Sequence, residues 1–121
     1  MEKTILVVTE HDDVRRTLRI RLAIAFPHYL VIEAAREEAV AIALSKSPCL
    51  VIIDMGIEAT AQLEVARRIK VVQPAVQIVV WTVHDWQSYR SDALAAGVTA
   101  YVLKEATQDN LLTVLVDLLA A

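Results

Sequence analysis

Leu50-Val51-Ile52-Ile53-Asp54 is the stretch that decides the fold, because four consecutive aliphatic residues run directly into a carboxylate. A strand that is apolar at consecutive positions is buried on both faces, which is typical of the parallel sheets of α/β proteins. Four comparable runs occur along the chain, at residues 4–8, 29–33, 77–81 and 100–103. The repetition predicts a sheet of five buried strands.

Alanine-rich stretches with apolar residues at helical spacing separate the strand runs. Leu18 and Leu22, for example, lie on one face of a predicted helix that continues from residue 14 toward Pro27. The other helices are predicted at residues 37–45, 58–72, 86–96 and 109–119. Strict alternation of strand and helix predicts a doubly wound α/β fold, with helices on both faces of a parallel sheet.

The composition excludes several other classes of protein. In 121 residues, a hydrophobic fraction of 56% argues against disorder, and only two Gly and three Pro argue against a turn-rich all-β fold. One Cys and three scattered His provide neither a disulfide scaffold nor a structural zinc site. We expect a single domain over residues 1–121.

Charge and hydropathy bear on location and partners. The net charge of −3 gives no general attraction for nucleic acid, and no apolar run is long enough to span a bilayer. The start of the chain, Met1-Glu2-Lys3, does not have the pattern of a signal peptide. We therefore expect a soluble, cytoplasmic domain that binds neither nucleic acid nor membrane by itself.

Polar side chains follow four of the predicted strands, at the sheet edge where α/β proteins bind ligands. These residues are Thr9, Glu10, Asp54, Thr82, His84 and Lys104. Carboxylates and a carbonyl suit Mg²⁺, whereas a lysine and a threonine hydroxyl suit a phosphoryl group. The pattern predicts a site where a carboxylate accepts a phosphoryl group from a small donor.

Residues 5–8, 50–54, 79–82 and 96–104, in this order and spacing, resemble the receiver domain of two-component response regulators. The resemblance implies a flavodoxin-like (βα)5 fold with strand order 2-1-3-4-5. It also implies a signalling protein, not an enzyme, that accepts a phosphoryl group from a histidine kinase or a phosphotransfer protein. At most, such a domain phosphorylates itself from small donors and removes its own phosphoryl group.

The same resemblance assigns roles to individual residues. It makes Asp54 the phosphoacceptor, Thr82 the switch hydroxyl and Lys104 the lysine that pairs with phosphate. Tyr101 is then the aromatic switch residue, whose inward or outward rotamer reports activation. His84, two residues after Thr82, is expected to tune the rate of autodephosphorylation, and Gly56 is its counterpart beside Asp54.

The metal site that the resemblance implies departs from the family pattern. Glu10, Asp54 and the main-chain carbonyl of Gly56 would bind Mg²⁺. The family usually has two aspartates after the first strand, where this chain has Thr9 and Glu10, so we expect weakened affinity for the metal. Thr9 could still hold a metal-bound water. We interpret Asp12 and Asp13 as the acidic start of a helix rather than as replacement ligands.

Other departures follow the acceptor. Ile57 and Glu58 occupy the positions of the usual Met-Pro pair, Gln62 that of a glycine, and Glu105 that of a proline. Without a helix breaker, the helix after Asp54 is expected to start early and to shorten the loop over the site.

The output surface implied by the resemblance covers residues 86–119, that is, the fourth helix, fifth strand and fifth helix. Its apolar content suggests a homodimer or docking on an effector, and a link to transcription is one possible output. Trp81 and Trp86 are interpreted as packing residues, and Cys49 as a small buried residue.

The sequence leaves two alternatives to a phosphorylated receiver. A pseudo-receiver would keep the fold and act through phosphorylation-independent protein contacts, which Thr9 and the changes after Asp54 favour. A flavin or nucleotide enzyme would need a Gly-rich phosphate loop after the first strand, where this chain is acidic instead.

Overall fold

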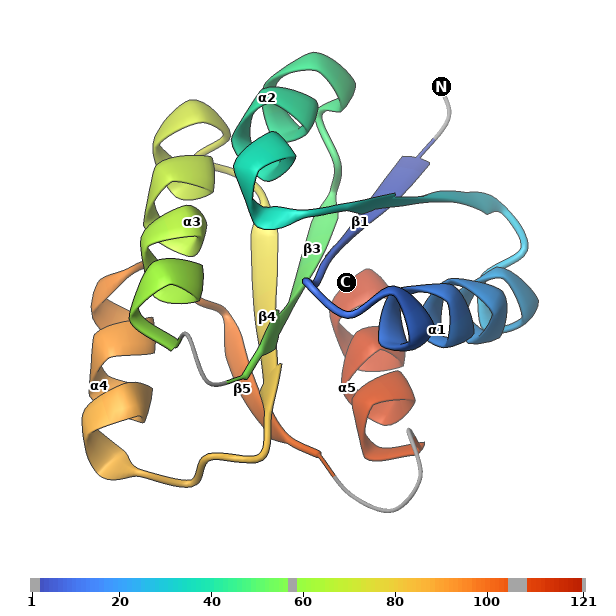
Figure 1. The fold of residues 1–121 in the computed structure, drawn as a ribbon. Helices are drawn as coiled ribbons and strands as arrows, with labels where there is room; N and C mark the ends of the chain where they lie inside the picture. The colour runs from blue at the N-terminus through green and yellow to red at the C-terminus, as the bar shows by residue number, and fades with distance from the viewer. Residues whose placement is uncertain (1–2, 57–58, 105–108, 121) are drawn as a thin grey trace.

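A computed structural model describes residues 3–56, 59–104 and 109–120, which alternate strictly between strand and helix (Figure 1). The strands are β1 (Lys3–Val8), β2 (Tyr29–Ala34), β3 (Leu50–Met55), β4 (Gln77–Thr82) and β5 (Ala100–Leu103). The helices are α1 (Asp12–Ala25), α2 (Arg36–Lys46), α3 (Ala59–Val72), α4 (Gln87–Ala95) and α5 (Asp109–Ala120). Every predicted element is present in these residues.

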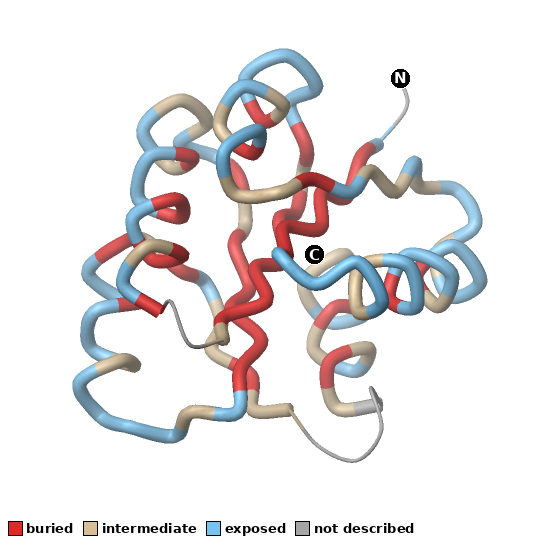
Figure 2. Tube along the Cα trace, viewed as in Figure 1, coloured by how far each residue is buried: buried red, intermediate tan, exposed pale blue. Residues whose placement is uncertain are grey.

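The sheet has five parallel strands in the order β2-β1-β3-β4-β5, which confirms the predicted fold and topology. β1 lies between β2 and β3, where Leu6 is in register with Ile32 on one side and Val51 on the other. All six residues of β3 are buried, because this strand has neighbours on both edges and helices over both faces (Figure 2).

Alternate residues of the central strands belong to two separate hydrophobic cores. Leu6 and Ile53 lie in the core beneath α2, α3 and α4. Ile5 and Ile52 lie in the opposite core, which α1 and α5 close with residues such as Leu18. The apolar runs of the sequence therefore have a direct structural reason, since each strand contributes to both cores.

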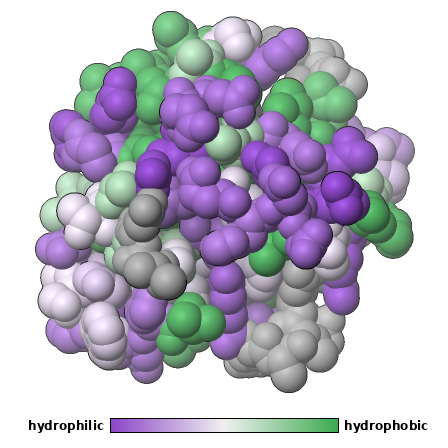
Figure 3. Space-filling model, viewed as in Figure 1, coloured by the Kyte–Doolittle hydropathy of each residue, from purple (hydrophilic) through white to green (hydrophobic). Residues whose placement is uncertain are grey.

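Hydrophilic side chains cover most of the face shown in Figure 3 and divide the exposed apolar residues into separate patches. The helices within residues 3–56, 59–104 and 109–120 are all too short or too polar to cross a membrane.

Candidate functional site

The predicted polar residues come together at the carboxyl edge of the sheet. Asp54 lies near the end of β3 with 1% of its side chain exposed. In the paired strand β4, Thr82 is in register with Met55, and Thr82 is fully buried. Parallel pairing thus places the Asp54 carboxylate and the Thr82 hydroxyl on neighbouring strands, at the sheet edge where the sequence predicted them.

Two side chains hold the carboxylate of Asp54. The Thr9 hydroxyl donates a hydrogen bond from Oγ1 to Oδ2 at 2.8 Å, within the buried interior. The ammonium of Lys104 forms an ion pair with Oδ1. The same ammonium lies 4.7 Å from the centre of the Trp81 ring, a cation–π distance. The buried negative charge is therefore balanced by one lysine.

A second set of contacts joins Thr82 to Tyr101. The main-chain N–H of His84 donates to Thr82 Oγ1 at 3.1 Å, and the Tyr101 hydroxyl donates to the main-chain carbonyl of His84 at 2.5 Å. Burial raises the pKa of the Tyr101 hydroxyl, so the phenol stays protonated and able to donate. Thr82 and Tyr101 are thus connected through the backbone of a single residue.

Gln62 is a site residue whose role sequence reasoning missed. It is 3% exposed, and its Nε2 donates to the main-chain carbonyl of Asp54 at 2.9 Å. The sequence showed only a glutamine at the position of a usual glycine. A buried polar residue one turn into α3 was the available signal, because buried polar groups are generally hydrogen-bonded.

The expected metal ligands are not assembled around Asp54. Glu10 is exposed, and its Oε1 accepts the main-chain N–H of Arg36 at 2.7 Å, at the start of α2. Among the described residues, no group of three or more His, Cys, Asp or Glu side chains could hold a metal ion. Both oxygens of Asp54 already have partners in Thr9 and Lys104. This donor set does not fit a Mg²⁺ site of the expected kind.

The loops beside the site agree with several sequence interpretations. Asp12 and Asp13 lie in the first turn of α1, as expected of a helix start. A Cβ at Gly56 would meet His11 Nε2 at 3.8 Å, an ordinary van der Waals contact among the described residues. Ile57, Glu58 and Glu105 lie outside the described residues, as do Met1 and Glu2, and α3 is described from Ala59.

The two tryptophans differ in how deeply they are buried. Trp81 is buried in the core, as predicted, but Trp86 is 57% exposed. Trp86 stacks instead on His84 and Tyr89, with ring centroids 5.1 Å away in both cases. Trp86, the N-cap residue of α4, therefore packs against Tyr89 of that helix but keeps more than half of its surface exposed.

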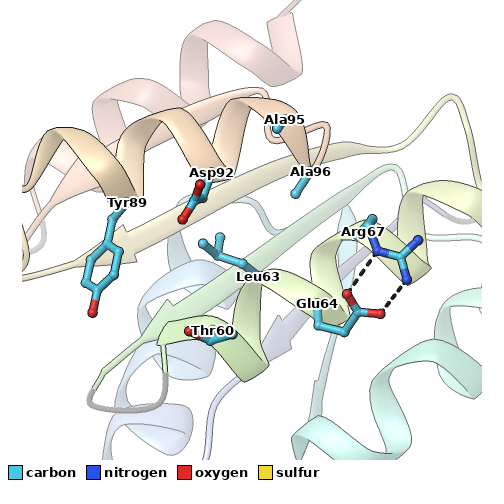
Figure 4. Close-up of a pocket in the computed structure, with 8 residues that line it drawn as sticks. All are labelled: Thr60, Leu63, Glu64, Arg67, Tyr89, Asp92, Ala95 and Ala96. Carbon is cyan, nitrogen blue, oxygen red and sulfur yellow. Dashed lines mark hydrogen bonds and ion pairs between the residues drawn. The ribbon is translucent and has the colours of Figure 1, made fainter.

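A groove of about 270 Å³ lies between α3 and α4 (Figure 4). Leu63 and the alanines of α4 form its apolar part, and an ion pair between Glu64 and Arg67 borders it. It contains none of the residues that contact Asp54.

The sequence matches the model of a known family over most of its length. The family model of the response regulator receiver domain matches residues 5–116. The chain belongs to this family. The predicted resemblance is thereby confirmed over nearly the whole chain.

Individual relatives agree with this assignment. The receiver is 26% identical to the transcriptional regulatory protein DegU of Brevibacillus brevis, over 89% of this chain and 46% of that protein. It is 27% identical to a two-component response regulator of the LuxR family from Aurantimonas sp. SI85-9A1, with a TM-score of 0.84 over 99% of this chain and 86% of that one. Chemotaxis protein CheY4 of Vibrio cholerae shares the fold, with a TM-score of 0.86 at 20% identity over 98% of this chain and 99% of that one. The receiver spans about half the length of the curated relatives it matches, 46% and 52%.

Proposed function

We propose that this receiver domain accepts a phosphoryl group on Asp54 from a histidine kinase or a phosphotransfer protein. The observation that carries the proposal is the ion pair between Asp54 and Lys104 at the carboxyl edge of the sheet. A nucleophilic carboxylate next to a cation provides both the attacking oxygen and positive charge for the group that arrives. Lysine is a common phosphate ligand in proteins.

In the proposed reaction, an oxygen of Asp54 attacks the phosphorus of a phosphohistidine. The new O–P bond forms while the P–N bond breaks, and the imidazole leaves with the electron pair. With a small acyl phosphate, the bond that breaks is P–O and a carboxylate leaves. Lys104 and the hydroxyl of Thr82 then contact the phosphoryl oxygens, which contributes most where the site excludes water.

The response to phosphorylation would use the contacts between Thr82, His84 and Tyr101. If the Thr82 hydroxyl turns toward a phosphoryl oxygen, its contact with the His84 N–H changes, and so does the loop whose carbonyl holds Tyr101. A contact made only in the phosphorylated state is what shifts a two-state equilibrium. His84 and Gly56, on either side of the acceptor, would set the access of water to the phosphoryl group.

The output proposed for this switch is the surface of α4, β5 and α5. Exposed apolar side chains such as Leu94 on α4 and Val116 on α5 suit a homodimer or an effector contact. DegU is a transcriptional regulatory protein, and the proposed output therefore includes control of transcription. Other parts of a longer protein in the cytoplasm would exert it.

A pseudo-receiver is the second candidate, and one observation favours it. Both carboxylate oxygens of Asp54 have partners in the unphosphorylated domain, and the expected metal ligands are not gathered there. A domain of this kind would signal through the same surfaces without accepting phosphate.

Intact-mass spectrometry after incubation with acetyl phosphate tests the proposal directly. We expect a mass gain of one phosphoryl group, absent in Asp54→Asn and present in Asp92→Asn, an exposed aspartate of α4. The reaction should be run with Mg²⁺ and with a chelator, so that metal dependence is read separately. A gain that persists in Asp54→Asn would overturn Asp54 as the acceptor. No gain from either acetyl phosphate or a phosphorylated histidine-containing phosphotransfer domain would favour the pseudo-receiver.

A further inference from the structure

We infer that Thr9 is a positioning residue whose hydroxyl, together with Lys104, holds the carboxylate of Asp54 and closes the site to divalent metal ions. The inference rests on the proposed function only in taking Asp54 as the acceptor. With Lys104 on Oδ1 and Thr9 on Oδ2, both oxygens of the buried carboxylate have a partner without a metal ion.

The two hydrogen bonds of Thr9 Oγ1 fix the direction in which its proton points. Thr9 Oγ1 accepts the main-chain N–H of His11 at 3.1 Å, which uses one lone pair. The hydroxyl proton is the donor in the 2.8 Å contact with Asp54 Oδ2, because an ionised carboxylate can only accept. Thr9 is also tied to the sheet through its own N–H, which donates to Ala34. The hydroxyl is therefore fixed as a donor toward Asp54.

The same geometry opposes a cation at Oδ2. The hydrogen bond from Thr9 occupies one of the two lone-pair sites of Oδ2, so a metal there would have to share this oxygen with the hydroxyl. Thr9 itself is a neutral group whose oxygen already accepts from His11 and donates to Asp54, so it adds no negative charge to attract a divalent ion.

Charge around Asp54 points the same way. Lys104 already neutralises the carboxylate through Oδ1, so a divalent ion would meet an ammonium beside a single negative charge. Glu10 is the acid next to Thr9 in the sequence, and its Oε1 is engaged by the N–H of Arg36. Moving Glu10 to a metal would expose that N–H at the start of α2.

A spectroscopic experiment tests metal exclusion without any phosphoryl donor. The chain has two tryptophans, so a Trp86→Phe background leaves Trp81 as the reporter, with the Lys104 ammonium 4.7 Å from its ring. Mg²⁺ and Mn²⁺ are titrated into this protein and into its Thr9→Asp and Thr9→Ser variants. We expect no saturable change in the parent or in Thr9→Ser, and a saturable change in Thr9→Asp, which supplies the missing acid.

The positioning role has its own readout. The ¹³C chemical shift of the Asp54 carboxyl carbon should move in Thr9→Val, which keeps the shape but lacks the hydroxyl, and return in Thr9→Ser. A merely structural threonine would leave that shift unchanged, which would overturn the positioning role.

Metal exclusion would be overturned by a saturable response of the parent protein that Glu10→Gln removes. If Thr9→Asp does not fold, Mn²⁺ broadening of the Asp54 and Gly56 amide signals in the parent decides the question. Selective broadening contradicts metal exclusion, and its absence supports it. Because no phosphoryl transfer is involved, these outcomes are independent of the mass-spectrometry test.

Discussion

Gln62 donates a hydrogen bond to the main-chain carbonyl of Asp54 at 2.9 Å, so the first turn of α3 is tied to the end of β3. Both residues are almost completely buried, at 3% and 2% exposure. The glutamine thus contacts the backbone of Asp54, while Thr9 and Lys104 contact its carboxylate. A side chain in place of the family's usual glycine gives this receiver an additional buried contact at its site.

Replacing Gln62 should destabilise the domain. Gln62→Ala leaves the buried Asp54 carbonyl without this partner and removes packed side-chain atoms, so we expect a loss of about 2 kcal/mol in the free energy of unfolding. Urea unfolding followed by circular dichroism measures it. Gln87→Ala, at an exposed position of α4, is the matched control and should change stability by no more than about 0.5 kcal/mol. Equal effects in both variants would contradict the role given to Gln62.

The two partners of the ion pair should differ in their sensitivity to substitution. Lys104→Met leaves a carboxylate that is 1% exposed without its counter-charge, and should cost about 3 kcal/mol. Asp54→Asn should cost less, because the lysine side chain is 23% exposed and its ammonium can reach water. The double variant should therefore be more stable than the sum of the two single losses indicates.

Unfolding by urea at neutral pH measures all four proteins of this cycle. Lys46→Met, at the exposed end of α2, serves as the control for loss of a lysine. Additive losses in the double variant would show that the two charges are not coupled.

Tyr101 should produce a dependence of stability on alkaline pH. Burial raises the pKa of its hydroxyl, so the folded state favours the protonated phenol that donates to His84. The resulting stability is complete below the ordinary pKa of about 10 and is lost as the pH rises through the folded value. Above pH 10, the free energy of unfolding should fall less steeply in Tyr101→Phe than in the parent protein.

Absorbance at about 295 nm, where tyrosinate absorbs, follows the titration itself. One of the three tyrosines should ionise later than the others, and Tyr101→Phe should remove this late step. Tyr89→Phe is the control, since it should leave the late step in place. If the late step disappears in Tyr89→Phe but not in Tyr101→Phe, the raised pKa belongs to Tyr89, and the assignment to Tyr101 is wrong.

The fold could be predicted from sequence because each strand and helix has its own local signal. Residues of β3 are apolar at every position before Asp54, and α1 shows Leu18 and Leu22 on one face. The spatial order of the strands has no such local signal and came from the resemblance to the family. The alternation of strand and helix restricts the topology to parallel sheets, but it does not determine the order in which the strands lie in the sheet.

The sequence predicted where the site lies in the fold but not the hydrogen bonds within it. Asp54, Thr82 and Lys104 follow from their places at strand ends, because parallel pairing brings those ends together. The hydrogen bonds of Thr9 and Gln62 depend on rotamers and on α3 packing against β3, which one-dimensional patterns do not contain. Trp86 shows the same limit, since its position before α4 decided its exposure.

The two glycines should respond in opposite ways to alanine. Gly97 has φ +93°, a conformation that L-residues rarely adopt, and a Cβ there would lie 2.9 Å from Cγ of Lys70. Lys70 cannot move without cost because its ammonium donates to the carbonyl of Val76 at 2.6 Å. Gly97→Ala should therefore lower the free energy of unfolding by about 2 kcal/mol.

Gly56→Ala is the matched comparison. Its added Cβ meets only an ordinary contact with His11 at 3.8 Å among the described residues, and its φ is not in the left-handed region. Alanine also restricts the unfolded chain, so we expect stability unchanged or raised by up to about 1 kcal/mol. Thermal and urea unfolding of both variants measure the difference. A loss in Gly56→Ala as large as that in Gly97→Ala would mean that the space beside Asp54 is closed, and would contradict the access of water that we assign to this side of the acceptor.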